Sequence, residues 1–155
     1  MGYIEDIRKL VGHRPLILVG AAAVISDDRG RILLQERRFP ENFWGIPGGL
    51  MELGETTEET AKREVREESG LEIDQLRLLG VYTGSTGSRG YSIAQNGDQY
   101  CAVTIAYYTR TFRGMLIVDP SESIKFEFRD PADLPEHLLK SSQLILQDYF
   151  SKIKD

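Results

Sequence analysis

Seven glutamates lie within residues 48–71, and their positions indicate more than a charged surface. They are Glu52, Glu55, Glu58, Glu59, Glu64, Glu67 and Glu68. A solvated acidic helix face, supported by pairs such as Arg63 with Glu67, accounts for Glu58 and Glu59. It does not account for carboxylates at i, i+3 and i+4 on a partly buried face, because their repulsion would cost several kcal/mol in a lowered dielectric.

The face on which these carboxylates lie follows from a predicted helix. Thr56 followed by Glu59 fits a capping box, and Gly70 fits a C-terminal cap. The residues between them contain no Gly or Pro. The sequence therefore predicts a helix over residues 57–69, about three and a half turns at 3.6 residues per turn.

On a helical wheel, Ala61 and Val65 mark the apolar stripe of this helix. Glu64 and Glu68 fall on or beside the stripe, and Glu67 lies one step further round. A carboxylate facing a core loses hydration without compensation, so a surface helix would normally place Leu or Ile at the two stripe positions. A hard divalent cation would supply the compensation. Oxygen ligands suit Mg²⁺ or Mn²⁺, which commonly bridge protein carboxylates to substrate phosphates.

Length, charge and cysteine content limit the classes of protein. The 155 residues are 41% hydrophobic and 28% charged, which predicts one compact domain over residues 1–155. A net charge of -5, with basic and acidic residues mixed along the chain, argues against a groove for long nucleic acid. The single cysteine, Cys101, excludes an internal disulfide and favours a reducing compartment, so we expect a cytoplasmic protein.

No segment is expected to cross a membrane. The longest apolar run, Pro15 to Ile25, is 11 residues, whereas a spanning helix needs about 20. The N-terminus shows no readable targeting signal. Apolar residues at helical spacing predict a short amphipathic helix over about residues 2–12, which would pack on the body or on a partner subunit in a possible homodimer.

The remaining pattern predicts an α/β fold. Two apolar strands flank the turn residues Asp27–Gly30 and indicate a β-hairpin. Further strands are expected at residues 44–47, 71–84, 98–112 and 124–129. Asp130 and Ser142 are candidate helix starts, and Cys101 is expected to be a small core residue of its strand. Strands on either side of a central helix, followed by helices, predict a mixed sheet covered on both faces.

The glutamate-rich segment also resembles a known family signature. The matching residues, at the spacing of a complete Nudix box, are Gly49, Glu55, Arg63, Glu64, Val65, Glu67, Glu68, Gly70 and Leu71. The resemblance extends to residues 44–49, Trp-Gly-Ile-Pro-Gly-Gly, and to the order of strands around the box. It implies the Nudix α/β/α sandwich and hydrolysis of a nucleoside diphosphate linked to another group.

The resemblance also assigns roles within the box. The implied ligands of Mg²⁺ are Glu64, Glu67, Glu68 and a backbone carbonyl of Gly48 or its neighbour. Glu55 and Arg63 would support the helix and the loop before it. A carboxylate left free of full metal ligation could deprotonate the attacking water, and the candidates are Glu64, Glu67 and Glu122.

Glu122 is a candidate because such hydrolases often take a further carboxylate from well downstream of the box. In the predicted strand 124–129, apolar Ile124 and the two phenylalanines alternate with charged residues. Glu122 has the parity of the apolar set, whereas Glu127 has the parity of the charged set. Parity therefore favours Glu122 over Glu127 as a residue that reaches the site.

The sequence indicates the substrate only weakly. The polar stretch Gly84–Asp98 is expected to be a loop that contacts the distinguishing part of the substrate, with Tyr91 stacking on a base. The proline typical of relatives that cleave ADP-ribose is missing, as is the array typical of NADH hydrolysis. Nucleoside triphosphates and nucleotide sugars stay open. The alternatives are a catalytically silent nucleotide-binding protein, an isomerase of isopentenyl-type diphosphates, or an RNA 5′ pyrophosphohydrolase.

Overall fold

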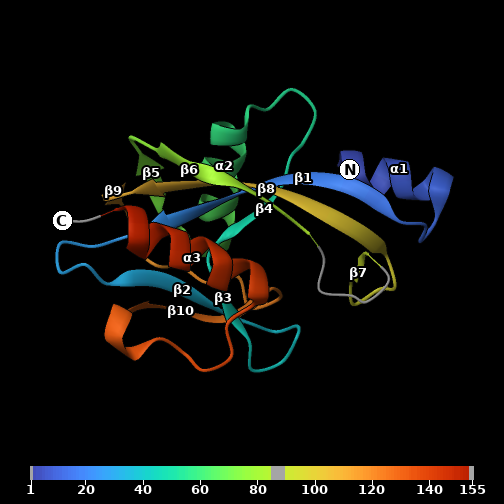
Figure 1. Cartoon of the computed structure of the whole chain (residues 1–155). Coiled ribbons are helices and arrows are strands. Elements are labelled where there is room, and N and C mark those ends of the chain that lie inside the picture. The colour runs from blue at the N-terminus through green and yellow to red at the C-terminus, as the bar shows by residue number, and fades with distance from the viewer. Residues whose placement is uncertain (1, 85–89, 154–155) are drawn as a thin grey trace.

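The computed structural model describes residues 2–84 and 90–153, in which two runs of strands are separated by a central helix and flanked by a helix at each end (Figure 1). In chain order the elements are α1 (Tyr3–Val11), β1 (Leu16–Ile25), β2 (Ile32–Arg37), β3 (Trp44–Gly45), β4 (Gly48–Leu50), α2 (Thr57–Ser69), β5 (Glu72–Asp74), β6 (Arg77–Gly84), β7 (Ser92–Ile93), β8 (Gln99–Thr109), β9 (Thr111–Arg113), β10 (Ser123–Arg129), a 3-10 turn (Pro131–Asp133) and α3 (Lys140–Lys152).

The described strands form a mixed sheet and two smaller antiparallel sheets. The mixed sheet has the order β4-β1-β8-β6, with β7 added beside β8. Its central pair, β1 and β8, runs parallel along the whole of β1, and the other pairs are antiparallel. The second sheet has the order β10-β2-β3, and the third pairs β5 with β9. The predicted mixed α/β fold is confirmed, with more than one sheet between the helices.

Helices lie on both sides of the mixed sheet (Figure 1). On one side, α2 packs Ala61 and Val65 onto β1, where Ala21 and Ala23 are fully enclosed. On the other side, α3 contributes a second cluster with the second sheet. The buried members of that cluster are Ala22, Val24, Ile32, Leu34, Trp44, Ile46, Leu79, Ala106, Leu138, Ile145, Leu146 and Tyr149. The odd-numbered side of β1 thus faces α2, and the even-numbered side faces α3.

The helix predicted over residues 57–69 is confirmed together with both of its caps. The Thr56 side chain accepts a hydrogen bond from the Glu59 N–H, and the Glu59 carboxylate accepts one from the Thr56 N–H. Gly70 closes the helix with a left-handed φ of 80°, a conformation that glycine adopts without a Cβ penalty.

The hairpin predicted at Asp27–Gly30 forms only at its turn. Ser26 and Ile32 make one antiparallel bridge, and the Asp27 carboxylate accepts hydrogen bonds from two backbone N–H groups of the turn. Beyond the bridge, β1 and β2 enter different sheets. The parts of the two strands nearest the turn, residues 20–25 and 32–35, are buried on both faces, so alternation of side chains could not show that the strands diverge.

Two expectations near the C-terminus need correction. A bulge between Ser123 and Lys125 changes the parity of β10, so Ser123 is buried and Ile124 is 47% exposed, the reverse of the expected arrangement. Helix α3 begins at Lys140 rather than at Ser142. Ser142 is buried in its first turn, where its hydroxyl accepts a hydrogen bond from the Ile46 N–H at 3.1 Å.

The stretch Gly84–Asp98 is only partly a loop. Residues 85–89 lie outside the described residues, and β7 then pairs with the start of β8 as a short hairpin. Cys101, expected in the core, is only partly buried, and its thiol donates a hydrogen bond to the carbonyl of Gly90 at 2.7 Å. Within the described residues, no helix has the length and apolar character required to traverse a bilayer.

Helix α1 confirms the amphipathic helix expected near the N-terminus but buries none of its residues. It is attached by polar contacts. The Tyr3 N–H donates to the Glu52 carboxylate at 2.8 Å, and Arg8 donates from Nη2 to the carbonyl of Gln99 at 2.7 Å. The helix therefore lies at the margin of the body, beside the starts of β1 and β8 (Figure 1).

Candidate active site

The site is built where α2 faces the glycine pair of β4. The Glu68 carboxylate, only 6% exposed, accepts a hydrogen bond from the Gly48 N–H at 3.0 Å. Gly49 allows Glu64 to approach β4, because a Cβ there would lie 2.3 Å from the Glu64 carboxylate carbon, whereas Gly48 allows β4 to lie close to β1, because a Cβ there would lie 2.4 Å from the Ala21 carbonyl oxygen. The two stripe glutamates thus lie against bare backbone, as the wheel of α2 requires.

Arg63 connects α2 to the loop that precedes it. Its guanidinium donates to both oxygens of Glu55, at 2.5 and 3.0 Å, and to the carbonyl of Leu50 at 2.9 Å. It also reaches Glu64 at 2.9 Å and Glu67 at 3.2 Å. These contacts suit the supporting role that we expect of Glu55 and Arg63.

The electrostatics of this cluster divide the carboxylates into two kinds. The Arg63 guanidinium holds the pKa of Glu55 at about 2, and Glu55 in turn raises the pKa of Arg63. Burial, together with the neighbouring charge of Glu64, raises the pKa of Glu68 to about 8. Burial likewise raises the pKa of Glu64, although Arg63 opposes the shift. Glu55 is therefore stabilised as a carboxylate, whereas burial outweighs the Arg63 contact at Glu64, and Glu68 has no ion pair among the described residues.

A buried glutamine holds Glu68 from a second direction. Gln35, on β2, is fully enclosed and donates from Nε2 to the Ser123 hydroxyl at 2.5 Å and towards Glu68 Oε2 at 3.4 Å. Among the described groups, its Oε1 has no hydrogen-bond partner. Ser123 directly follows Glu122, so Gln35 links the α2 carboxylate to the segment that carries Glu122.

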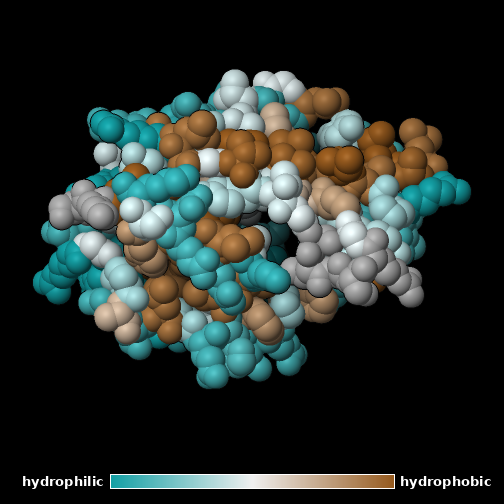
Figure 2. All heavy atoms as spheres, viewed as in Figure 1, coloured by the Kyte–Doolittle hydropathy of each residue, from teal (hydrophilic) through white to brown (hydrophobic). Residues whose placement is uncertain are grey.

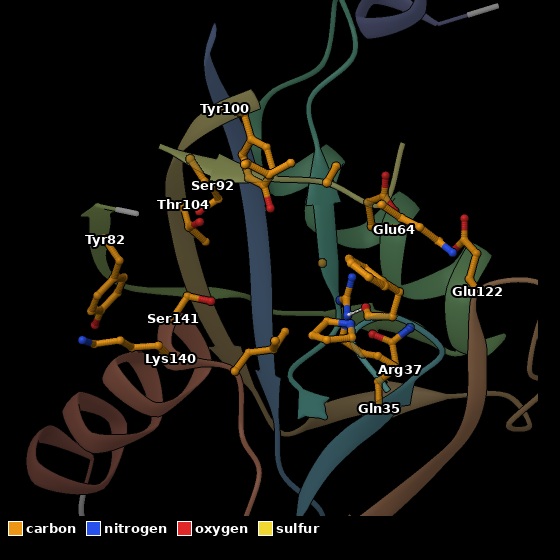
Figure 3. Close-up of a pocket in the computed structure, with 18 of the residues that line it drawn as sticks. Gln35, Arg37, Glu64, Tyr82, Ser92, Tyr100, Thr104, Glu122, Lys140 and Ser141 are labelled. Atoms are coloured by element: carbon orange, nitrogen blue, oxygen red, sulfur yellow. Dashed lines mark hydrogen bonds between the residues drawn. The ribbon is translucent and has the colours of Figure 1, made fainter. Parts of the chain in front are cut away.

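A cavity of about 750 Å³ opens beside these residues (Figure 3). In this view Glu64 and Glu122 lie at one end, with Arg37 and Gln35 below them, and Tyr82 and Lys140 lie at the other end. Glu122 is exposed and is placed by the end of β2, where the N–H and Nε of Arg38 donate to the carbonyls of Glu122 and Pro120. The cavity thus combines a carboxylate end with cationic and hydroxyl groups that could contact phosphates and a sugar.

The structure gathers most, but not all, of the residues expected at the site. Gly48, Glu64, Glu68 and Glu122 line the cavity. Glu67 points to the exposed side of α2, where its side chain is 54% exposed and pairs with Arg63. Within the described part of the chain, the lining does not include Glu67 or Tyr91.

Tyr100, rather than Tyr91, is the tyrosine of the β7–β8 hairpin that lines the cavity, together with Ser92, Ile93, Ala94 and Gln95. The described lining of the cavity thus includes neighbours of Tyr91, and contact of this hairpin with a substrate stays a prediction. Glu127, the alternative to Glu122, instead contacts Lys125 at 2.9 Å and Arg129 at 3.4 Å. It is not among the described lining residues.

Sequence reasoning did not find Gln35, Ser123, Arg37 or Lys140. A signal existed for Gln35, because it is a polar residue that directly follows the buried apolar run of β2. Adjacent arginines at positions 37 and 38 were a weaker signal. Nothing local marked Lys140, because the fold alone brings the start of α3 to the cavity.

The donor set fits a divalent cation, although the side chains do not form a finished cage. In the part of the chain that is described, no group of three or more Asp, Glu, His or Cys side chains is already arranged to hold a metal ion. Glu68 nevertheless offers buried carboxylate oxygens, and Glu64 offers partly buried ones of which Oε1 also contacts Arg63, beside the backbone of Gly48. Such a set suits a hard cation such as Mg²⁺ or Mn²⁺ and not a soft one.

Comparison with known proteins agrees with this geometry. The family model of the NUDIX domain matches residues 16–149. A MutT-like protein of Streptomyces ambofaciens is 43% identical over 72 residues, 46% of each chain. An ADP-ribose pyrophosphatase of Methanocaldococcus jannaschii is 29% identical over 133 residues, 84% of this chain and 72% of the relative. The matches cover only 46%, 34% and 25% of the length of three curated relatives.

A solved structure extends the likeness to most of the fold. The crystal structure of a MutT NUDIX hydrolase from Burkholderia pseudomallei has a TM-score of 0.71 and 31% identity, and the match covers 86% of this chain and 98% of the other. Members of the family generally use divalent metal ions. The family model and the solved relative each account for most of the chain, which therefore belongs to the Nudix hydrolase family.

Proposed function

We propose that the chain hydrolyses the diphosphate linkage of a nucleoside diphosphate joined to another group, with Mg²⁺ or Mn²⁺ as the cation. The observation that carries the proposal is Glu68, a buried carboxylate beside Gly48 and Glu64 at the wall of an open cavity. Such a group destabilises the fold unless it serves a ligand.

Different residues of the site would bind the cation and the phosphates. Glu64, Glu67 and Glu68, with the carbonyl of Gly48, would hold the cation, which when bound would polarise the phosphorus and neutralise the leaving phosphate. Arg37, which lines the cavity at the same end as Glu64, would bind a phosphate oxygen.

A carboxylate that lines the cavity would take the proton of the attacking water. Glu64 and Glu122 meet that requirement, whereas the exposed position of Glu67 makes it the weakest of the three candidates. Glu122 is the more accessible of the two, because it is exposed while Glu64 is partly buried.

The proposed substrates are small nucleotides. The cavity of about 750 Å³ has the size of a small-molecule site. The missing proline counted against ADP-ribose, but a relative named as an ADP-ribose pyrophosphatase shares 29% identity over 133 residues, so ADP-ribose belongs among the compounds to test. The isomerase alternative loses support, because Cys101 contacts Gly90 and is not among the described lining residues. A cytoplasmic location stays a prediction.

A single assay with product identification tests the proposal. The purified protein with Mg²⁺ is offered nucleoside triphosphates, nucleotide sugars, ADP-ribose, NADH and a 5′-triphosphorylated RNA oligonucleotide. We expect cleavage of at least one small nucleotide into a nucleoside monophosphate and a phosphorylated remainder, and loss of cleavage with excess chelator. Tight binding of a nucleotide without cleavage of any compound would favour the silent binding protein, and cleavage of the RNA alone would favour the RNA pyrophosphohydrolase.

A further inference from the structure

Helix α2 covers only part of its side of the mixed sheet. Ala61 packs against Ala21 of β1 and Tyr107 of β8, and the Tyr107 hydroxyl lies 2.6 Å from the Thr57 hydroxyl at the start of α2. Towards the starts of β1 and β8, none of the described helices packs on this side, because α1 lies at the margin and buries no residue. The same face therefore continues beyond α2 without a helical cover.

The strand register identifies the side chains on this uncovered face. Residues directly opposite one another in a ladder point to the same side of a sheet. Leu78 lies opposite Tyr107, Val81 opposite Ile105, Thr83 opposite Val103, Val19 opposite Val103 and Ile17 opposite Cys101. Since Tyr107 faces α2, the other side chains of these rows face the same way.

These rows form an apolar band across three strands. We define the band as Ile17, Val19, Leu78, Val81, Cys101, Val103 and Ile105. Its most exposed members are Ile17, Leu78 and Val81, whose exposed fractions are 76%, 60% and 59%. The space-filling view shows a continuous hydrophobic stretch along this edge of the molecule (Figure 2).

The strands that carry the band contain almost no charge. Residues 16–25, 78–84 and 99–109 include no Asp, Glu, Lys or Arg. A sheet face that meets water normally alternates apolar and polar positions, and exposed strands are commonly protected by charged side chains. A charge-free apolar face of this kind marks a surface that another structure covers.

The total surface of the chain supports the same conclusion. A monomer of 17.5 kDa is expected to expose about 7,900 Å², whereas this chain exposes 9085 Å². The surplus of roughly 1,200 Å² exceeds the roughly 800 Å² that each partner buries in an interface of standard size. The surplus belongs to the whole chain, including helix α1, which buries none of its residues, so it agrees with an interface without measuring the area of the apolar band.

We propose that the apolar band is the interface of a homodimer, in which two copies pack their bands together about a two-fold axis. Two copies of a chain with a net charge of -5 repel each other, so their contact requires a surface free of acidic residues, and the band provides one. The same patch meets itself across a two-fold axis, and an apolar band is complementary to itself. Nucleic acid or a charged peptide would find no opposite charge on the band.

Measurement of mass in solution tests this interface. Sedimentation or light scattering of the wild-type chain, from about 1 to about 100 μM, should give twice the protomer mass of 17.5 kDa. Ile17→Lys and Val81→Lys should each give monomers, because a two-fold axis would bury two lysines at one interface. Both positions lie outside the proposed catalytic residues, so hydrolysis per protomer should persist, which shows that the variants fold.

Met115→Lys is the matched control, because Met115 is 76% exposed and apolar but lies outside the band. It should leave the dimer intact. The midpoint of thermal unfolding should rise with protein concentration for the wild type and for Met115→Lys, and not for the band variants. A wild-type monomer at the highest concentration, or dimers of both band variants, would overturn the proposal. Flotation of that monomer with phosphatidylcholine vesicles would instead assign the band to a lipid surface.

Discussion

The carboxylates of Glu55 and Glu68 show how opposite environments arise within one short segment. Both are largely enclosed, but Glu55 is surrounded by donors from Arg63, Thr60 and the backbone of Glu52. Glu68 has the Gly48 N–H and a long contact from Gln35, and it faces Glu64. The first carboxylate stabilises the loop by itself, whereas the second needs a cation.

This contrast predicts how stability without metal depends on pH. The pKa of Glu68 is raised from 4.5 to about 8, so the folded chain keeps its proton at pH values where the unfolded chain has lost it. Glu68 therefore costs nothing below about pH 4.5, and its cost grows as pH rises towards 8, to at most about 5 kcal/mol at about 1.4 kcal/mol per pKa unit.

The measurement is thermal unfolding of the metal-free protein between about pH 5 and pH 8. The midpoint should fall with rising pH, and Glu68→Gln should reduce the slope. Glu55 and Asp27 do not confuse the test, because their pKa values are lowered and they titrate below this window. A wild-type midpoint that rises steadily from pH 5 to pH 8 would show that Glu68 is not buried as a protonated acid.

A second prediction concerns the carboxylate from outside the box. Glu122→Gln should lower turnover by about tenfold or more, equivalent to about 1.4 kcal/mol of transition-state stabilisation, with little change in thermal stability. Glu122 lines the cavity and is exposed, so it can act on a ligand without supporting the core. Glu127→Gln is the matched control, because Glu127 pairs with Lys125 away from the cavity. Loss of turnover in the control alone would reverse the assignment.

The residues of the site differ in how far sequence could identify them. The wheel of α2 identified Glu64 and Glu68, because helical periodicity persists through 57–69 without interruption. Glu122 was expected from a strand parity that the bulge at Ser123 breaks, so its position at the cavity does not support that reasoning. Gln35 was not found, because its partners come from distant segments of the chain.

At the scale of elements, α2 is specified locally and its ends are sharply defined. Gly70 has a left-handed φ, and a Cβ there would lie 2.7 Å from the carbonyl oxygen of Met115. Gly54 also has a positive φ, of 87°, but a Cβ there would meet nothing within 4 Å. A side chain at Gly54 would therefore introduce backbone strain alone, whereas one at Gly70 would introduce backbone strain and a steric clash.

Replacement of each by alanine should show the difference. Gly54→Ala should cost about 1 kcal/mol through its φ alone, a fall of about 2–4 °C in the unfolding midpoint. Gly70→Ala should cost at least about twice as much, because a backbone carbonyl cannot move aside as the end of a side chain can. Equal midpoints for the two variants would mean that the contact with Met115 is not rigid.

The elements themselves were predictable where one periodicity dominates. Helix α2 and the parallel core strands are long and strongly patterned, and the sequence places them correctly. Strands β1 and β2 were joined as a hairpin, because a strand buried on both faces carries no record of its partner. The start of α3 was misplaced because a serine before an apolar run suggests a helix N-cap. In the structure the Ser142 hydroxyl instead accepts a hydrogen bond from the Ile46 N–H, a tertiary contact that the sequence does not reveal.

At the scale of the whole molecule, basic residues gather at the cavity although the net charge of the chain is negative. The chain carries -5 overall, yet Arg37, Arg38 and Lys140 line the same cavity as the carboxylates of α2 and Glu122. This arrangement suits the proposed ligand, a nucleotide whose negatively charged phosphates bind a divalent cation. The apolar band lies on the α2 side of the mixed sheet, where none of its seven residues lines the cavity, so assembly and hydrolysis can be tested separately.

The most direct test of the central claim is the turnover of Glu68→Gln compared with Glu58→Gln at saturating Mg²⁺ and substrate. Both changes remove one charge from α2, but Glu58 is exposed and outside the cavity lining. We expect Glu68→Gln to lose about 100-fold or more in kcat, at least about 2.7 kcal/mol, with its fold intact, and Glu58→Gln to keep wild-type turnover. Near-normal hydrolysis by Glu68→Gln would contradict the account.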